Sequence, residues 1–260
     1  MTNDIRNVRD IDWAKWRGAY GPSGSGPHDV ADAIEALSAG PDDEERFAEA
    51  IELLSSHVWH QGTIYPVTAQ VLPFLFEIMD GIPSDTLGAY DELAGFIPRC
   101  ACSARIATRA KDPREREGSE EVLTALRSER ARLLAWTRTP LRGDAVATML
   151  QVSELRSLVL TPNAELALEP RDVLLIVLGQ LGEGGLVFDT DVLSWTARAL
   201  EDLHHEVATS AASMLREAAG GDERPRSPPK LAALANALGR NERLDTVADL
   251  FFPLRIPNKR

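Results

Sequence analysis

Apolar residues along this chain recur mostly with the spacing of α-helices, and the alternation typical of strands is nearly absent. Val30, Ile34 and Leu37 share one face of a helix that should begin after Asp29, a residue that suits the capping position. Gly40 then provides a signal for the helix to end. The pattern therefore predicts an amphipathic helix between Asp29 and Gly40.

The same periodicity, taken together with the positions of proline and glycine, predicts helices over most of the remaining chain. Pro98 lies inside one of them, over about residues 84–109, and should kink or split it. The other expected helices cover roughly residues 42–54, 66–80, 120–137, 144–156, 171–181, 191–203, 206–219, 230–238 and 242–252.

Consecutive helix pairs recur at intervals of roughly 40 residues, which is typical of proteins in which one pair stacks on the next. We therefore expect an all-α fold, a right-handed α–α superhelix built from degenerate helix pairs. It should form a single solenoid domain over residues 1–260, with acidic repeats over 1–82 and further repeats over 120–260. Linkers are expected over 110–119, which is highly charged, and over 220–229.

Negative charge is concentrated at the N-terminal end of the chain. Residues 1–80 carry five Lys and Arg against 14 Asp and Glu, whereas the whole chain carries 28 against 40, a formal charge of −12. An acidic end can attract a basic partner, and it can also serve simply as a solvated surface. The excess of acid argues against nucleic-acid binding, because phosphate contacts need Lys and Arg.

The two cysteines, Cys100 and Cys102, are separated by one residue, which fits neither a redox motif nor a zinc knuckle. We expect them to be reduced and to pack as small apolar side chains. The N-terminus shows no apolar secretory region, and the most apolar run, residues 173–178, is too short to cross a bilayer. These features predict a cytoplasmic protein that does not associate with membranes.

Residues 57–65 gather imidazole, indole, amide and phenol groups between two expected helices. Such a segment can be a recognition loop, because aromatic side chains offer a large contact area at low entropic cost. It can also be a turn between repeats, in which Gly62 adopts a special backbone angle, Thr63 caps the next helix and Pro66 occupies its first turn. The composition favours the structural interpretation and leaves the functional one open.

Two stretches resemble repeats of the HEAT/armadillo-like type. One covers residues 191–215, where small alanines would let helices approach closely. The other covers residues 12–79 and is carried by Trp13, Ala19-Tyr20-Gly21, Asp29-Val30, His60-Gln61-Gly62-Thr63-Ile64-Tyr65 and Pro73-Phe74-Leu75. The resemblance to this bacterial family implies a HEAT-like solenoid. Some members are similar to immunity proteins found beside toxins, which implies protein binding rather than catalysis.

No motif for catalysis or metal binding stands out in the sequence. The chain lacks a nucleophile elbow, a phosphate-binding loop, a dinucleotide fingerprint and the H-E-x-x-H pattern. Two histidine pairs, His57 with His60 and His204 with His205, have no acidic or cysteine ligand at the usual spacing, and zinc needs three or four converging groups. We therefore expect no catalytic residues, no metal and no cofactor.

One enzymatic alternative comes from the same resemblance. Some HEAT-like proteins are DNA glycosylases that hold alkylated DNA with Trp, Asp and Arg side chains on a concave surface. Trp195, Asp191 and Arg198 form one conceivable set in this chain. The acidic balance argues against the basic groove that such an enzyme needs, and tryptophans are more typical of helix packing.

The sequence therefore favours a non-catalytic interaction module. Its most specific form is an immunity-type protein whose acidic end covers a basic partner such as a toxin. An internal scaffold without a dedicated partner is the simpler alternative. The residues expected to contact the partner come from the aromatic segment and from an acidic stretch, and they are Trp59, His60, Gln61, Thr63, Tyr65, Asp42, Asp43, Glu44 and Glu45.

Overall fold

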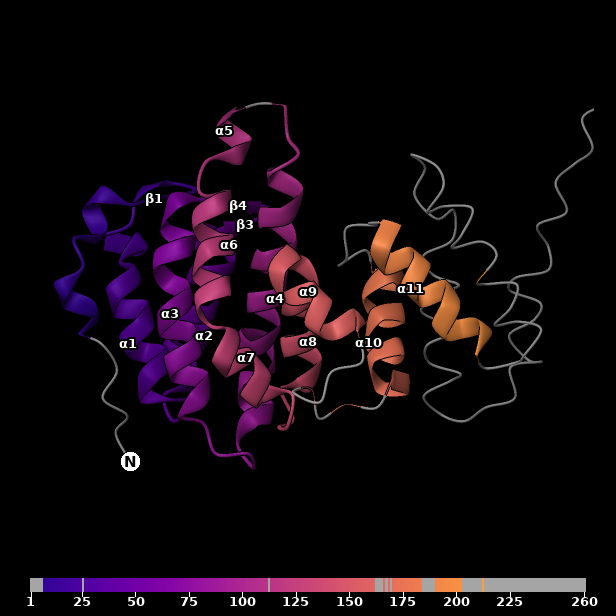
Figure 1. Cartoon of the computed structure of the whole chain (residues 1–260). Helices are drawn as coiled ribbons and strands as arrows, with labels where there is room; N and C mark the ends of the chain where they lie inside the picture. Colours follow the sequence, from indigo (N-terminus) through magenta and orange to yellow (C-terminus); the bar gives the residue numbers. More distant parts are fainter. Residues whose placement is uncertain are drawn as a thin grey trace, which may run out of the picture. The chain divides into compact units, whose positions relative to one another are not determined.

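The computed structural model of the protein describes residues 7–24, 26–111, 113–161, 166, 168, 170–183, 190–202 and 212. This part of the chain is mostly helical, which confirms the all-α class (Figure 1). Contacts within the chain divide it into two compact units, residues 1–156 and 157–260, and each unit is described by itself. The expectation of one domain over residues 1–260 stays a prediction.

The N-terminal unit begins with short elements that precede its first long helix. Two 3-10 turns, η1 (Val8–Asp10) and η2 (Trp13–Lys15), lead into a hairpin of β1 (Arg17–Gly18) and β2 (Gly21–Pro22). A third turn, η3 (Gly26–His28), follows the hairpin. The two-residue strands are short departures from the helical pattern, and they do not build a larger sheet within the described residues.

The first three helices lie where the sequence predicts them. Asp29 caps α1 (Val30–Ala39) by accepting hydrogen bonds from the backbone N–H groups of Ala31 and Asp32, and Gly40 ends the helix with φ 96°. Asp43 caps α2 (Glu44–Leu53) in the same way. Pro66 is the first residue of α3 (Pro66–Asp80).

The remaining elements of this unit differ from the sequence expectations in their boundaries. A short turn, η5 (Leu87–Tyr90), precedes α4 (Asp91–Ala107), which continues through Pro98 without splitting. The expected linker over 110–119 contains the short helix α5 (Pro113–Arg116), and the single helix expected over 120–137 is instead two helices. These are α6 (Ser119–Ser128) and α7 (Arg130–Trp136), and they are followed by α8 (Arg142–Gln151) and by α9 (Ser153–Leu160), within which the division between the two units falls.

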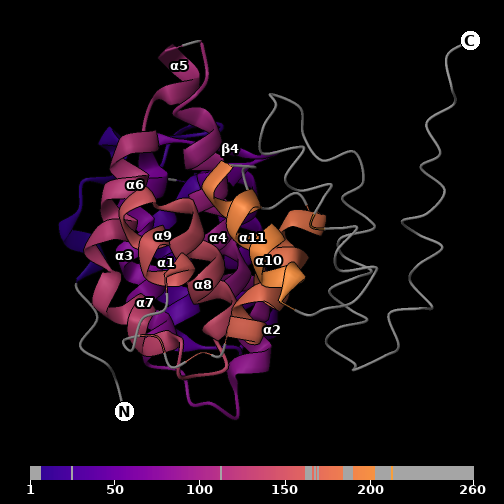
Figure 2. The same ribbon diagram turned by 45° about the vertical axis from the view of Figure 1, so that its right-hand side comes forward.

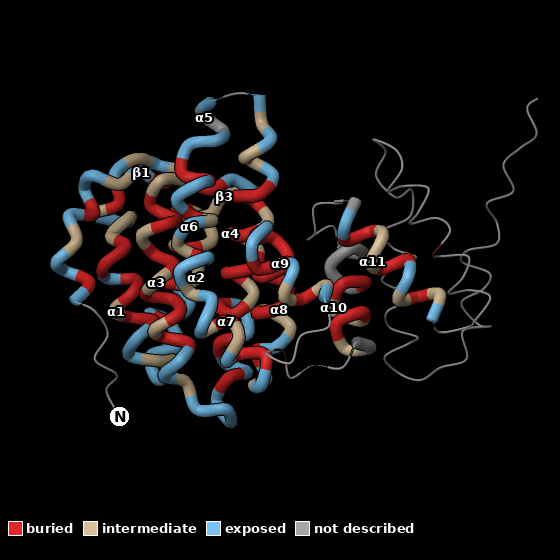
Figure 3. The backbone as a smooth tube through the Cα atoms, viewed as in Figure 1, coloured by how far each residue is buried: buried red, intermediate tan, exposed pale blue. Residues whose placement is uncertain are grey.

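Successive helices of the N-terminal unit pack in a regular order. Helix α1 packs against α2 and α3, α3 packs against α6, and α4 packs against both α6 and α8. Helices α3 and α6 lie side by side in both views (Figure 1, Figure 2). The backbone is buried along much of α3, α4 and α8 (Figure 3). The largest fully buried side chains are Phe76, Phe96, Ile34, Leu37, Leu54, Leu72, Leu75, Met79, Leu93, Ile97, Leu126 and Leu133.

In the second unit, the described helices are α10 (Pro170–Glu183) and α11 (Thr190–Glu201), which pack against each other. Both match helices expected from the sequence. The helices expected over 206–219, 230–238 and 242–252, and the linker over 220–229, lie outside the described residues. Among the helices described above, none combines the length and the apolar character needed to cross a membrane.

Candidate functional site

The aromatic segment, residues 57–65, covers the end of a π-helical turn and a second hairpin. A π-helical turn, η4 (Leu54–Val58), continues α2 and leads into β3 (Trp59–His60), which pairs with β4 (Thr63–Ile64). Gln61 and Gly62 connect the strands with φ angles of 49° and 83°, as a two-residue turn between twisted strands requires. A turn at this place and the special angle of Gly62 are thus confirmed, and its position between two repeats stays a prediction.

Thr63 does not cap the next helix, so that prediction is wrong. Thr63 is paired in β4 opposite His60, and the residue before α3 is Tyr65. The backbone N–H of Tyr65 donates to the Thr68 hydroxyl at 3.0 Å, and that hydroxyl donates in turn to the Val58 carbonyl at 2.6 Å. Thr68 therefore ties the start of α3 to the end of η4.

Two expected partner-binding residues are engaged inside the protein. The indole nitrogen of Trp59 donates to the Ser103 hydroxyl at 2.8 Å, and its ring packs edge-on against Phe96. The Arg99 guanidinium lies 5.6 Å from the centre of the same ring. Tyr65 is half-buried, and burial raises the pKa of its hydroxyl. Trp59 thus fastens the second hairpin to α4.

The other expected residues are accessible but lie in two separate places. Gln61 and Thr63 are exposed at the tip of the second hairpin, while residues 42–45 are all exposed at the start of α2. The last eight residues of α2 and all of η4 lie between the two groups, and the α-helical part alone spans about 12 Å along the helix axis. The structure therefore does not bring the aromatic and acidic groups into one site.

A cluster that the sequence analysis did not single out joins the two hairpins. Tyr20, at the tip of the first hairpin, is 57% exposed. Its ring stacks on His28 with ring centres 5.5 Å apart and meets the edge of His60 at 5.6 Å. His28 in turn stacks on His57, with centres 4.6 Å apart. We call these four residues the imidazole–phenol cluster.

The buried member of this cluster, His57, holds the first hairpin in place. The backbone N–H of Tyr20 lies 3.4 Å from Nδ1 of His57, so Nδ1 accepts and Nε2 carries the proton. Nε2 therefore donates to the Ser23 hydroxyl at 2.9 Å. In this tautomer His57 cannot take a proton from Ser23, and Ser23 is fully buried. The pair is structural rather than a nucleophile with its base.

The electrostatics of His57 follow from its position. Burial, reinforced by the charge of His28, lowers the pKa of His57 to about 4. Close packing adds a second constraint, because a Cβ atom on Gly18 would lie 2.4 Å from Nε2 of His57 and 2.5 Å from its carbonyl oxygen. Glycine at position 18 is therefore required for the hairpin to lie on the imidazole.

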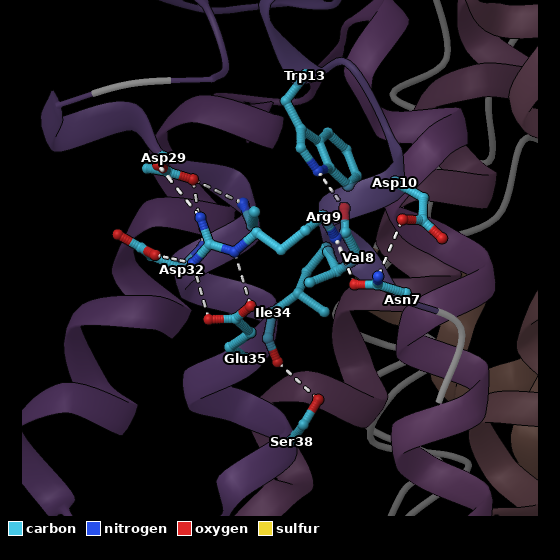
Figure 4. A network of polar contacts seen from close by, with 11 residues as sticks. Asn7, Val8, Arg9, Asp10, Trp13, Asp29, Asp32, Ile34, Glu35 and Ser38 are labelled. Atoms are coloured by element: carbon cyan, nitrogen blue, oxygen red, sulfur yellow. Dashed lines mark hydrogen bonds and ion pairs between the residues drawn. The ribbon is translucent and has the colours of Figure 1, made fainter. Parts of the chain in front are cut away.

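A second polar network joins η1 to α1 (Figure 4). Arg9, from η1, donates from Nε and Nη2 to the two carboxylate oxygens of Glu35 at 2.7 and 2.8 Å. The same guanidinium pairs with Asp32 and lies 4.0 Å from Asp29. These bonds raise the pKa of Arg9 and lower that of Glu35. Figure 4 also shows the Trp13 indole donating to the Val8 carbonyl.

A groove of about 600 Å³ runs between α1 and α2. Its lining includes four carboxylates, a histidine of the imidazole–phenol cluster and one arginine. Small apolar residues form part of the same surface. Among the lining residues are Asp29, Asp32, Glu49, Glu52, Arg46 and Ala36.

A second groove, of about 310 Å³, is lined by residues of α4, α6 and the α8–α9 connection. Its arginines make contacts within the protein. Arg105 is buried and donates to the Gln151 carbonyl at 2.9 Å, near the end of α8, where a cation complements the helix dipole. Arg127 pairs with Glu154 at 2.8 Å. These contacts give the arginines structural roles.

The residues of the glycosylase alternative all lie on α11. Asp191 and Arg198 are exposed and Trp195 is half-buried. In the N-terminal unit, by contrast, Trp13 and Trp136 are each 4% exposed and pack against Phe74 and Phe76, as expected for packing residues. Among the described residues, no group of three or more His, Cys, Asp and Glu side chains is arranged to hold a metal ion.

Comparison of the chain with models of known protein families, with curated proteins and with solved structures found no match. The resemblance to HEAT/armadillo-like repeats stays a prediction.

Proposed function

We propose that this protein is a non-catalytic, HEAT-like interaction module whose acidic N-terminal end binds a basic protein partner. The observation that carries this proposal is the charge of the α1–α2 pair. Exposed carboxylates occupy the start of α2 and also both sides of the groove between the two helices. A surface of one sign speeds encounter with a partner of the opposite sign and disfavours partners of the same sign.

The packing order of the N-terminal unit supports the solenoid part of the proposal. Helices α1 and α2 pack together, and so do α3 and α4. Contacts of α1 with α3 and of α3 with α6 form one series, and α4 contacts both α6 and α8. Contacts that pass from one helix pair to the next are what stacked pairs produce.

The most specific form of the proposal is an immunity-type protein that acts in the cytoplasm and neutralises a basic partner such as a toxin. Support comes from the sequence resemblance and from the acidic surface together. Because Trp59 is bound to α4 within the protein, we leave it out of the surface that contacts the partner. Of the expected residues, we assign the contact to the exposed ones, Gln61 and Thr63 at the hairpin tip and residues 42–45 at the start of α2.

Affinity purification from the native source tests this function directly. The tagged full-length chain is used as bait at low salt and again at high salt, and bound proteins are identified. We expect a basic protein that is captured at low salt, and whose association rate falls steeply as salt is added. A specific partner that is neutral or acidic, or one whose association rate is insensitive to salt, would contradict the electrostatic mechanism.

A further inference from the structure

The groove between α1 and α2 has walls and a floor of different chemistry. Asp29 and Asp32 stand on the α1 side, and Glu49 and Glu52 stand on the α2 side. The two members of each pair are at positions i and i+3, so they lie on the same face of their helix or of its first turn. The floor includes Ala33, Ala36 and Ala50, all buried.

The two walls differ in how their carboxylates are already used. On the α1 side, Asp29 caps the helix and Asp32 pairs with Arg9. On the α2 side, Glu49 and Glu52 are exposed and form no ion pair within the described part of the chain. Arg46 is the one arginine among the lining residues, while Arg9 lies against the two carboxylates of the α1 side. The groove therefore has unused acceptors, chiefly along α2.

The chemistry of a suitable ligand follows from the shape of the groove as well as its charge. Small alanine side chains leave space for the methylene stem of a long side chain, which gains by covering apolar surface. Opposed carboxylates then suit a planar head group with donors on several edges. A guanidinium has five such donors, whereas an ammonium is a compact point charge.

The protein itself contains one example of this recognition. Arg9 makes a two-point contact with Glu35 of α1 while pairing with Asp32 (Figure 4). Asp32 also lines the groove. Carboxylates spaced along this helix thus bind a guanidinium in the folded protein.

We propose that the groove between α1 and α2 binds the guanidinium of an arginine side chain carried by a basic segment of the partner protein. This inference rests on the proposed function and makes it specific, since it names the groove and the head group. Glu49 and Glu52 provide the principal acceptors, Asp32 is shared with Arg9, and the alanine floor receives the methylene stem.

The test uses the full-length protein, labelled with ¹⁵N, and a capped peptide of alternating arginine and glycine as the probe. Two further peptides replace each arginine with lysine or with neutral citrulline. The variant Glu49→Gln/Glu52→Gln removes the proposed acceptors. Its matched control, Glu92→Gln/Glu121→Gln, removes the same charge from exposed positions of α4 and α6, outside the groove and outside the proposed contact surface. All four glutamates are exposed, so both variants should fold, which thermal unfolding verifies.

The arginine peptide should shift the amide signals of Ala36 and Ala50 at low salt, and the lysine and citrulline peptides should bind more weakly. Glu49→Gln/Glu52→Gln should weaken binding about five- to tenfold, and the control less than about twofold. Equal weakening by both variants, or equal binding of the lysine and arginine peptides, would overturn the proposal that the groove binds a guanidinium. Neither result would contradict the proposed binding of a basic partner by the acidic surface. Absence of shifts at Ala36 and Ala50 would also overturn the groove, while capture of a basic partner separately decides the function.

Discussion

The imidazole of His28 lies flat on the imidazole of His57, with ring centres 4.6 Å apart and planes inclined by 7°. His57 is fully buried, whereas His28 lies at the groove between α1 and α2. Two parallel imidazoles at this separation repel each other when both are charged, and burial further disfavours the charged form of His57. The neutral form of His57 is therefore built into the fold, and this makes stability depend on pH.

We expect the free energy of unfolding to fall as pH decreases from about 6.5 to about 4. The pKa of His57 is about 4 in the folded protein, and a histidine in an unfolded chain titrates near 6.5. The unfolded state thus takes up the proton first, which costs the folded state about 3 kcal/mol across this window. Urea unfolding at several pH values measures the effect.

The variant His57→Gln provides the comparison for this prediction, because glutamine does not titrate. Other groups contribute equally to both proteins, so the difference in stability between them isolates His57. The advantage of the native protein should be largest above pH 6.5 and should shrink toward pH 4. A difference that stays constant over this range would show that His57 titrates normally in the folded state.

Gly18→Ala should destabilise the protein by about 1–3 kcal/mol, because the new methyl group would overlap His57. Gly143→Ala is the matched control. Gly143 lies in α8, and an added Cβ there meets no other atom within 4 Å. Alanine in a helix should stabilise by about 0.5–1 kcal/mol. Chemical denaturation of both variants measures the contrast, and a neutral Gly18→Ala would mean that the hairpin does not rest on His57.

Trp136→Phe should cost about 2 kcal/mol, since it removes a hydrogen bond to a carboxylate and leaves a small cavity. The Trp136 indole donates to Asp80 at 2.7 Å, and Arg132 pairs with the other oxygen of Asp80 at 2.9 Å. Asp80→Asn keeps an acceptor for the indole and should cost less. Thermal unfolding ranks the two variants, and the reverse order would assign the stability to the ion pair.

Arg9→Ala should raise the pKa of Glu35 toward the ordinary value for glutamate. The hydrogen bonds from Arg9 are the main cause that lowers this pKa, and Arg46 acts on it only through its charge. Arg46→Ala should therefore produce a smaller rise. Carboxyl ¹³C signals followed through an acid titration measure both shifts, and equal shifts in the two variants would rule out a specific bond to Arg9.

Local signals made the first helices predictable. Asp29 and Gly40 delimit α1 because a carboxylate cap and a glycine with positive φ act within a few residues of the chain. The division between α6 and α7 was missed, because Glu129 marks it by backbone angles alone, without a proline or glycine. Thr63 was misassigned because a short hairpin competes with the cap for the same residues.

The candidate site was only partly predictable, because its contacts join distant parts of the chain. The acidic character of the N-terminal end follows from composition, but the groove depends on how α1 packs against α2. His57 was identified as part of an unusual segment, whereas its partners Tyr20 and His28 lie about thirty residues or more away. Periodicity and spacing carry no signal for such pairings.

The segment before the first hairpin, residues 7–16, packs as a cover on α1 and α3. Val8 and Trp13 are buried, Trp13 packs against Phe74 of α3, and Arg9 fastens η1 to α1. The segment thereby covers apolar surface next to α3. In the solenoid that we propose, such a cover would close one end of the stack, as a terminal repeat requires.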